Sequence, residues 1–129
     1  MCGIAGILTL DGRPVTAEEV APMLTAITHR GPDQGAVIVD GAAALGNRRL
    51  AILDLSPSGA LPMRSHDGRY ILAYNGEIYN HLSLRAQIPA LRDVPWQSTS
   101  DAETIIELYR VEGAHMLDYV RGMFAFALW

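Results

Sequence analysis

Short apolar runs bounded by turn residues predict most of the strands in this chain. Residues 4–10 form one such run before the turn residues 11–14, and residues 36–39 and 43–45 flank Asp40-Gly41. Runs of this length between turn residues are typical of strands, and an Asp-Gly pair between two of them is typical of a hairpin. Further strands are predicted over residues 50–55, 70–74 and 123–129.

A helix is predicted between the first strand and this hairpin. Thr16 and Glu19 form a capping-box pattern, in which each side chain accepts a hydrogen bond from the other residue's backbone N–H. Apolar residues follow at helical spacing from position 20 to position 27. Gly31 and Pro32 then end the helix, because glycine favours the C-terminal position and proline does not continue a helix.

Two more helices are predicted in the second half of the chain. Ser100 with Glu103 repeats the capping-box pattern and begins a helix that runs to Gly113, while residues 82–88 predict a shorter helix. Strands followed by helices in this order indicate an α+β fold whose antiparallel sheets carry helices on their outer faces. Spacing alone does not separate a layered sandwich from a simpler α+β arrangement.

Composition limits the range of functions. The 129 residues are 50% hydrophobic, which is enough for one domain spanning residues 1–129. A net charge of −4 without a cationic run argues against nucleic acid or an anionic membrane as a partner. No apolar stretch reaches the roughly 20 residues that span a bilayer, and no secretory signal is visible. A single cysteine suits a reducing compartment, so we expect a cytoplasmic protein.

Cys2 is the first candidate for chemistry. It follows Met1 directly, so removal of Met1 would place a thiol nucleophile and a free amine on the same residue. N-terminal nucleophile enzymes use such an amine as the base that activates the side chain. The alternative is a small buried cysteine at the start of an edge strand, which is what most cysteines are.

Three other positions have both a functional and a structural interpretation. Asn75-Gly76 offers a side-chain amide and an unobstructed N–H for an oxyanion, but Asn-Gly is also the strongest short signal for a hairpin turn. Arg49 would suit a substrate carboxylate, or it lies on the surface. Asp101 would suit a substrate ammonium, or it only begins a helix. His29 invites a cysteine–histidine dyad, but its position before Arg30-Gly31-Pro32 favours a structural role.

Neither a metal site nor a nucleotide site is expected in this chain. The other three histidines have no metal-ligand spacing to the cysteine or to one another. No phosphate-binding glycine motif is present either.

Six blocks of the sequence together resemble class II glutamine amidotransferase domains, and the resemblance is greatest to the glutaminase domain of glutamine-hydrolysing asparagine synthetases. The resemblance covers the chain in order and at compatible spacing. Its blocks are residues 1–6, 29–33, 48–52, 75–80, 100–103 and 122–127.

The resemblance implies a four-layer α-β-β-α sandwich of the N-terminal nucleophile type. It also implies that Cys2 is the nucleophile, with its own amine as the base, and that glutamine is cleaved through a γ-glutamyl thioester. Asn75 and Gly76 correspond to the oxyanion hole, Arg49 to the group that holds the α-carboxylate, and Asp101 to the group that holds the α-ammonium. Other positions that contact glutamine in the family correspond to Leu50, Ile52 and Glu77.

The resemblance implies a partner for the ammonia as well. In the family, a synthetase domain or subunit receives it and activates aspartate with ATP and magnesium, so no cofactor is expected in this chain itself. The chain differs from the family at Asn47, where a histidine is common, and at Leu61, where a glutamine is usual. Both positions lie outside the named catalytic roles.

The apolar run that ends at Trp129 indicates a domain cut short at its C-terminus. An inactive fragment or a binding module with the same fold is therefore an alternative, as is a glutaminase that serves a different acceptor. An unpaired strand edge would also favour pairing with another chain, which leaves a homodimer open.

Overall fold

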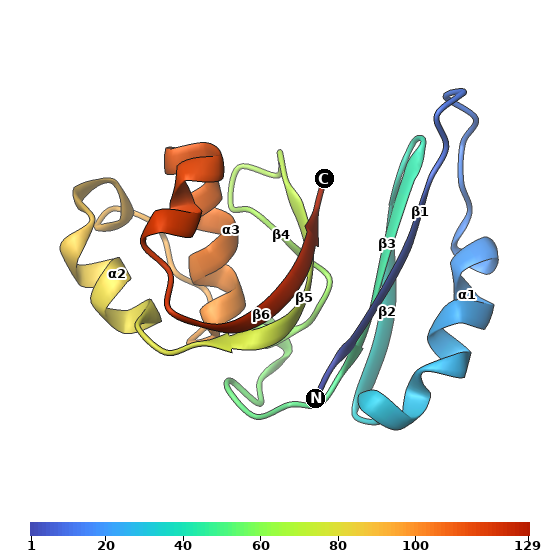
Figure 1. Ribbon diagram of the computed structural model, residues 1–129, viewed down its shortest axis with the longest axis horizontal. Coiled ribbons are helices and arrows are strands. Elements are labelled where there is room, and N and C mark those ends of the chain that lie inside the picture. Colours follow the sequence, from blue (N-terminus) through green and yellow to red (C-terminus); the bar gives the residue numbers. More distant parts are fainter.

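The structure is a computed structural model that describes residues 1–129. Its strands and helices follow one another along the chain in the order that Figure 1 displays by colour. The strands are Gly3–Leu8 (β1), Gln34–Asp40 (β2), Ala43–Arg49 (β3), Met63–Arg64 (β4), Ile71–Ile78 (β5) and Gly122–Leu128 (β6). The α-helices are Ala17–Ala26 (α1), His81–Gln87 (α2) and Asp101–Glu112 (α3). Short 3₁₀ helices are Thr28–Arg30, Pro57–Gly59, Pro89–Leu91 and Gly113–Asp118.

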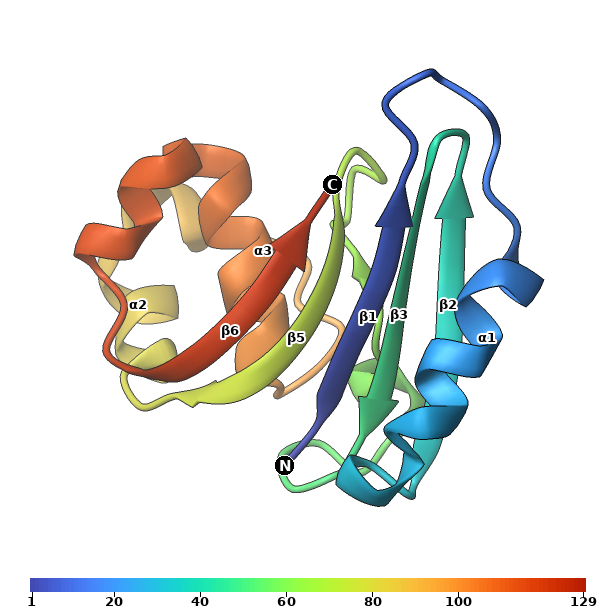
Figure 2. The same cartoon turned by 45° about the vertical axis from the view of Figure 1, so that its right-hand side comes forward.

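The strands form two antiparallel three-stranded sheets. The first has the order β1-β3-β2 and the second the order β4-β5-β6. The sheets face each other, with α1 outside the first and α2 and α3 outside the second (Figures 1 and 2). This arrangement confirms the α+β fold and the four-layer α-β-β-α sandwich.

Most of the apolar core lies between each sheet and its own helices. Val20 and Leu24 of α1 pack with Ala44 of β3 in the smaller cluster. The larger cluster has 13 buried residues, because α2, α3 and the loops around them cover one face of β5 and β6. Burial of these apolar side chains is the main stabilising contribution to both halves of the sandwich.

The layer between the two sheets is different in character. Side chains alternate between the two faces of a strand. Leu72 and Tyr74 of β5 face the helices, so Ala73 between them faces the first sheet. By the same alternation, the helix-facing Phe124, Phe126 and Leu128 leave Ala125 and Ala127 of β6 facing that sheet. Small side chains here allow the sheets to approach closely. From the opposite sheet, Asn47 of β3 extends into this layer and bonds to the backbone of β5.

Several predicted elements are confirmed, and the prediction of one strand is wrong. The hairpin around Asp40-Gly41 joins β2 to β3, with Gly41 at φ 57°. Residues 50–55 do not form a strand: β3 ends at Arg49, and a loop follows. The apolar side chains of this loop misled the prediction, because Leu50, Ile52 and Leu53 line a pocket instead of a sheet face.

The turn interpretation of Asn75-Gly76 is also wrong. Both residues lie inside β5, where they pair in register with Ala125 and Phe124 of β6. The predicted strand 70–74 therefore continues to Ile78, because a distant strand pairs with it. No helix of the structure combines the length and apolar character needed to cross a membrane.

The two capping boxes have different outcomes. Glu19 accepts a hydrogen bond from the Thr16 N–H at 2.9 Å, as predicted. Ser100 also caps its helix, by accepting from the N–H of Ala102 at 3.2 Å. Glu103, however, does not complete the second box. Its carboxylate instead accepts from the backbone of Gln97 and Ser98, which fixes the chain just before α3.

We expect the same substitution at two helical leucines to separate the buried core from the surface. Leu108→Ala in α3 removes a side chain that is 0% exposed, and should lower the free energy of unfolding by about 2–5 kcal/mol through lost burial and a cavity. Leu82→Ala in α2 alters a side chain that is 65% exposed, and should change it by less than about 0.5 kcal/mol. Urea unfolding followed by circular dichroism measures both. Equal effects would contradict the assignment of this core.

Candidate functional site

One pocket of about 230 Å³ opens at the end of the sandwich where β1, β3 and β5 come together. All eight residues predicted for the site line it, namely Cys2, Arg49, Leu50, Ile52, Asn75, Gly76, Glu77 and Asp101. The lining also includes residues that the sequence did not single out for the site, which are Met1, Leu53, Leu61, Tyr74, Ser100 and Met123. The pocket thus joins segments about 100 residues apart in the chain.

Cys2 lies directly before β1 and is half-buried. The backbone N–H of Leu50 donates to its sulfur at 3.4 Å, and the thiol lies 3.7 Å from the Leu50 carbonyl oxygen. On its other side, Arg30 donates from Nε to the Cys2 carbonyl oxygen at 3.0 Å. Both the side chain and the backbone of Cys2 are therefore held in place at the pocket wall.

Asn75 and Gly76 enter the pocket from an open edge of β5. In an antiparallel ladder, alternate residues direct their N–H and C=O groups toward opposite neighbouring strands. Ile71 exchanges both of its hydrogen bonds with Trp129, so Gly76 lies at a position that faces away from β6. Strand β4 pairs only as far as Leu72, so the Gly76 N–H points into space that no strand occupies.

Glycine at position 76 is a steric requirement. A Cβ there would lie 2.5 Å from the Met123 carbonyl oxygen and 2.6 Å from the Phe124 Cα. Both are backbone atoms of β6 and have little freedom to move. A glycine therefore allows the tight β5–β6 pairing and, at the same time, leaves its N–H uncovered on the pocket side.

Arg49 is 7% exposed and lies at the end of β3. Its Nη2 donates to the carbonyl oxygens of Leu53 and Asp54, at 2.9 and 2.5 Å. Gly59 allows this position, because a Cβ there would lie 2.6 Å from Nη2. Nη2 therefore shapes the loop after β3, while Nη1 and Nε keep their hydrogens for another acceptor.

Asp101 is 4% exposed and forms the first residue of α3. One carboxylate oxygen, Oδ2, accepts from the Tyr74 hydroxyl at 2.6 Å and from the Ile78 N–H at 2.8 Å. Burial and the neighbouring Asp101 raise the pKa of Tyr74 above its ordinary value, so the phenol stays a neutral donor. The other oxygen, Oδ1, has no hydrogen-bond donor in the structure and remains available.

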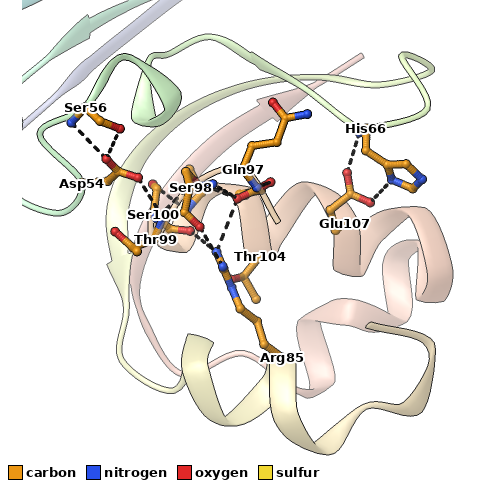
Figure 3. A network of polar contacts seen from close by, with 12 residues as sticks. Asp54, Ser56, His66, Arg85, Gln97, Ser98, Thr99, Ser100, Thr104 and Glu107 are labelled. Atoms are coloured by element: carbon orange, nitrogen blue, oxygen red, sulfur yellow. Dashed lines mark hydrogen bonds and ion pairs between the residues drawn. The ribbon is translucent and has the colours of Figure 1, made fainter. Parts of the chain in front are cut away.

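The two loops on either side of the pocket are tied to each other (Figure 3). Asp54 accepts from the Thr99 N–H at 2.7 Å and from the Ser56 backbone. Hydrogen bonds from Ser56 and Thr99 lower the pKa of the Asp54 carboxyl. Asp54 adopts a φ of 52°, which is uncommon for a residue with a Cβ. The Asp54–Thr99 bond therefore links the loop after β3 to the start of α3.

Arg85 of α2 supports the second of these loops from behind. It donates to the carbonyl oxygens of Ser98 and Ser100 at 2.9 and 2.6 Å, and to the Thr104 hydroxyl at 2.7 Å (Figure 3). Its guanidinium also lies 3.8 Å from the centre of the Trp96 ring. These contacts fix the turn that presents Asp101.

The sequence did not point to Arg30 or Tyr74 as parts of this site. A signal for Arg30 existed in Arg30-Gly31-Pro32, because Gly31 lies against the backbone of β3, where a Cβ would come within 2.3 Å of the Arg48 carbonyl carbon. Tyr74 had no local signal, since its hydroxyl meets Asp101 only after α3 packs on β5.

His29 does not form a dyad with Cys2. It is exposed in a 3₁₀ turn, and no hydrogen bond joins it to the thiol. The geometry therefore favours the structural interpretation, in which His29 is part of the turn before Gly31. No three side chains of the His, Cys, Asp and Glu types are grouped so that they could hold a metal ion.

Comparisons with known proteins give the chain a family. A family model for the glutamine amidotransferase domain matches residues 1–129. Asparagine synthetase (glutamine-hydrolyzing) 2 of Bacillus subtilis strain 168 is 38% identical over 132 residues, which cover 100% of this chain and 17% of that protein. Asparagine synthetase B (glutamine-hydrolyzing) of Escherichia coli K12 is 38% identical over 130 residues, which cover 100% of this chain and 23% of that protein.

A solved structure has the same fold. It is the glutamine phosphoribosylpyrophosphate amidotransferase of B. subtilis, in complex with ADP and GMP. The TM-score is 0.78 at 22% identity, over 99% of this chain and 35% of that one. This chain thus spans less than a quarter of the length of either asparagine synthetase. From the match along its whole length, the chain belongs to the glutamine amidotransferase domain family.

Proposed function

We propose that this chain hydrolyses the side-chain amide of L-glutamine to glutamate and ammonia, with Cys2 as the nucleophile once Met1 has been removed. The observation that carries the proposal is the content of one pocket. It holds a thiol, an uncovered strand edge, a buried cation and a buried carboxylate. An amino acid with a side-chain amide requires each of these four groups.

In the proposed reaction the Cys2 amine takes the thiol proton, and the sulfur attacks the amide carbon of glutamine. The resulting oxyanion accepts hydrogen bonds from the Asn75 side-chain amide and the Gly76 N–H, which become stronger as charge develops. Collapse of this intermediate transfers the proton to the departing nitrogen, so that ammonia leaves and a γ-glutamyl thioester remains. Water, activated by the same amine, then cleaves the thioester to give glutamate and the free thiol.

The proposed binding mode uses the two buried charges. One of the two nitrogens of Arg49 that have no partner in the protein, Nη1 or Nε, donates to the α-carboxylate of glutamine, and Oδ1 of Asp101 accepts from its α-ammonium. A full two-point fork from Arg49 would need Nη2, which already holds the loop carbonyls of Leu53 and Asp54. Leu50, Ile52 and Glu77 are assigned to the remaining substrate contacts at the pocket wall and rim.

The ammonia is proposed to pass to a synthetase domain or subunit that forms asparagine from aspartate. Support comes from the relatives named above, which are described as glutamine-hydrolyzing asparagine synthetases. ATP and magnesium would serve that acceptor reaction and are assigned no residue of this chain. Localisation in the cytoplasm is part of the same proposal.

Covalent labelling tests the identity of the nucleophile. We expect a diazoketone analogue of glutamine to alkylate residue 2 and to abolish turnover, with mass spectrometry finding Cys2 as the first residue of the labelled chain. Cys2→Ser should lose both labelling and activity, since an alcohol is a much weaker nucleophile than a thiol at neutral pH. Retention of Met1 in active protein, or labelling at another residue, would refute the mechanism.

Asn75→Ala tests the oxyanion contact. Loss of one oxyanion donor should lower kcat for glutamine hydrolysis by about 10²–10³-fold. Asn80→Ala is the matched control, because Asn80 bonds to the backbone of Tyr119 and Arg121 and does not line the pocket. Steady-state ammonia release measures both variants, and an unchanged kcat in Asn75→Ala would remove this residue from the mechanism.

Arg49→Lys tests the carboxylate contact. We expect KM for glutamine to rise by roughly 10–100-fold, the range of a charge-assisted hydrogen bond, because lysine lacks the planar guanidinium that serves loop and substrate together. Arg48→Lys changes the neighbouring residue, which bonds to the Gly31 carbonyl oxygen outside the pocket. The same KM in all three proteins would exclude Arg49 from substrate binding.

A further inference from the structure

Asn47 is a buried polar residue at the centre of the sandwich. It lies on β3, is 0% exposed, and faces the second sheet. A polar side chain in such a place is destabilising unless its hydrogen-bonding groups are satisfied. Asn47 meets this condition with backbone partners only: Gly3 and Tyr74 from two other strands, and at a longer 3.5 Å the carbonyl oxygen of Arg48 in its own strand.

Its first partner is the backbone of Tyr74. Asn47 Oδ1 accepts from the Tyr74 N–H at 2.7 Å, and Nδ2 donates to the Tyr74 carbonyl oxygen at 3.0 Å. These two groups point away from β6, at a place that β4 does not reach. The side-chain amide thus takes the position of a missing strand, directly before Asn75.

Its second partner lies beside the thiol. Nδ2 also donates to the Gly3 carbonyl oxygen at 3.2 Å. Gly3 is the first residue of β1 and directly follows Cys2. The backbone of β3 itself continues from Asn47 to Arg49 and to Leu50, whose N–H contacts the Cys2 sulfur. One side chain therefore connects the strands that carry the thiol, the guanidinium and the predicted oxyanion donors.

We propose that Asn47 is a positioning residue, which sets the distance between Cys2, directly before β1, and Asn75-Gly76 on β5. This role rests on the glutaminase activity proposed above. It acts through the backbone, without contact to the substrate. A displaced β5 would leave the thiol intact but would move the donors away from the oxyanion.

Two substitutions at position 47 test this role. Asn47→Leu keeps the number and branching of the side-chain heavy atoms and removes all of the hydrogen bonds of the amide, while Asn47→Ser leaves room for water to replace them. We expect kcat for glutamine hydrolysis to fall by about 10²-fold, the effect of a displacement of about 1 Å at a reacting centre. Alkylation of Cys2 by iodoacetamide needs no oxyanion donor, so its rate should stay within about 3-fold of that of the unsubstituted chain.

Ser65→Ala is the matched control. Ser65 directly follows β4, is buried, accepts from the Tyr70 N–H at 3.0 Å and does not line the pocket. Its kcat should remain within about 2-fold of that of the unsubstituted chain. Circular dichroism shows which variants are folded. If Asn47→Leu does not fold, the kcat and alkylation rate of Asn47→Ser test the positioning role.

Three outcomes would overturn the positioning role. One is an unchanged kcat in a folded variant, and another is an equal fall in turnover and in iodoacetamide alkylation. The third is unfolding of both variants while Ser65→Ala folds, because Asn47 would then hold the fold and not the site geometry. Failure of the proposed function looks different, since the unsubstituted chain would then neither hydrolyse glutamine nor be labelled at Cys2.

Discussion

The site depends on the backbone groups along one edge of β5. Strand β4 stops after two residues, so the N–H and C=O groups of β5 beyond Leu72 have no neighbouring strand on that side. Buried backbone groups must find partners, and side chains supply them here: Asn47 pairs with Tyr74, and Asp101 accepts from Ile78. Gly76 lies between these two and faces the pocket. The short length of β4 therefore leaves the Gly76 N–H free as a donor.

Small side chains between the sheets make this arrangement possible. The residues of β5 and β6 that face the first sheet include Ala73, Ala125 and Ala127, whereas the larger Phe124 and Phe126 pack on the helical side. A short side chain such as Asn47 reaches the opposing backbone only where the sheets lie close together. Strand β1, which follows Cys2, is the neighbour of β3 in the same sheet, so Asn47 also reaches the Gly3 carbonyl oxygen. Packing in the middle layer and geometry at the pocket thus have one origin.

The sequence predicted local features better than long-range pairing. The Asp40-Gly41 hairpin and the helix starts at Thr16 and Ser100 follow from residues only a few positions apart, and they are confirmed. Asn75-Gly76 has an equally strong local signal for a turn, but pairing with β6 keeps both residues extended. Residues 50–55 are mostly apolar like a strand, but they form a loop in which Leu50, Ile52 and Leu53 line the pocket. The roles of Arg30 and Tyr74 at the site could not be predicted from local sequence, because their partners come from distant segments.

Arg49 and Asp101 each serve the pocket in two ways. Nη2 of Arg49 fixes the loop carbonyls of Leu53 and Asp54, and Oδ2 of Asp101 fixes Tyr74 and Ile78. Half of each charged group therefore holds the pocket wall, while the other half has no partner in the protein. Both side chains are less than a tenth exposed, so a ligand would not have to order them on binding. Because the two groups have opposite charge and share one pocket, a zwitterion complements them better than a singly charged ligand does.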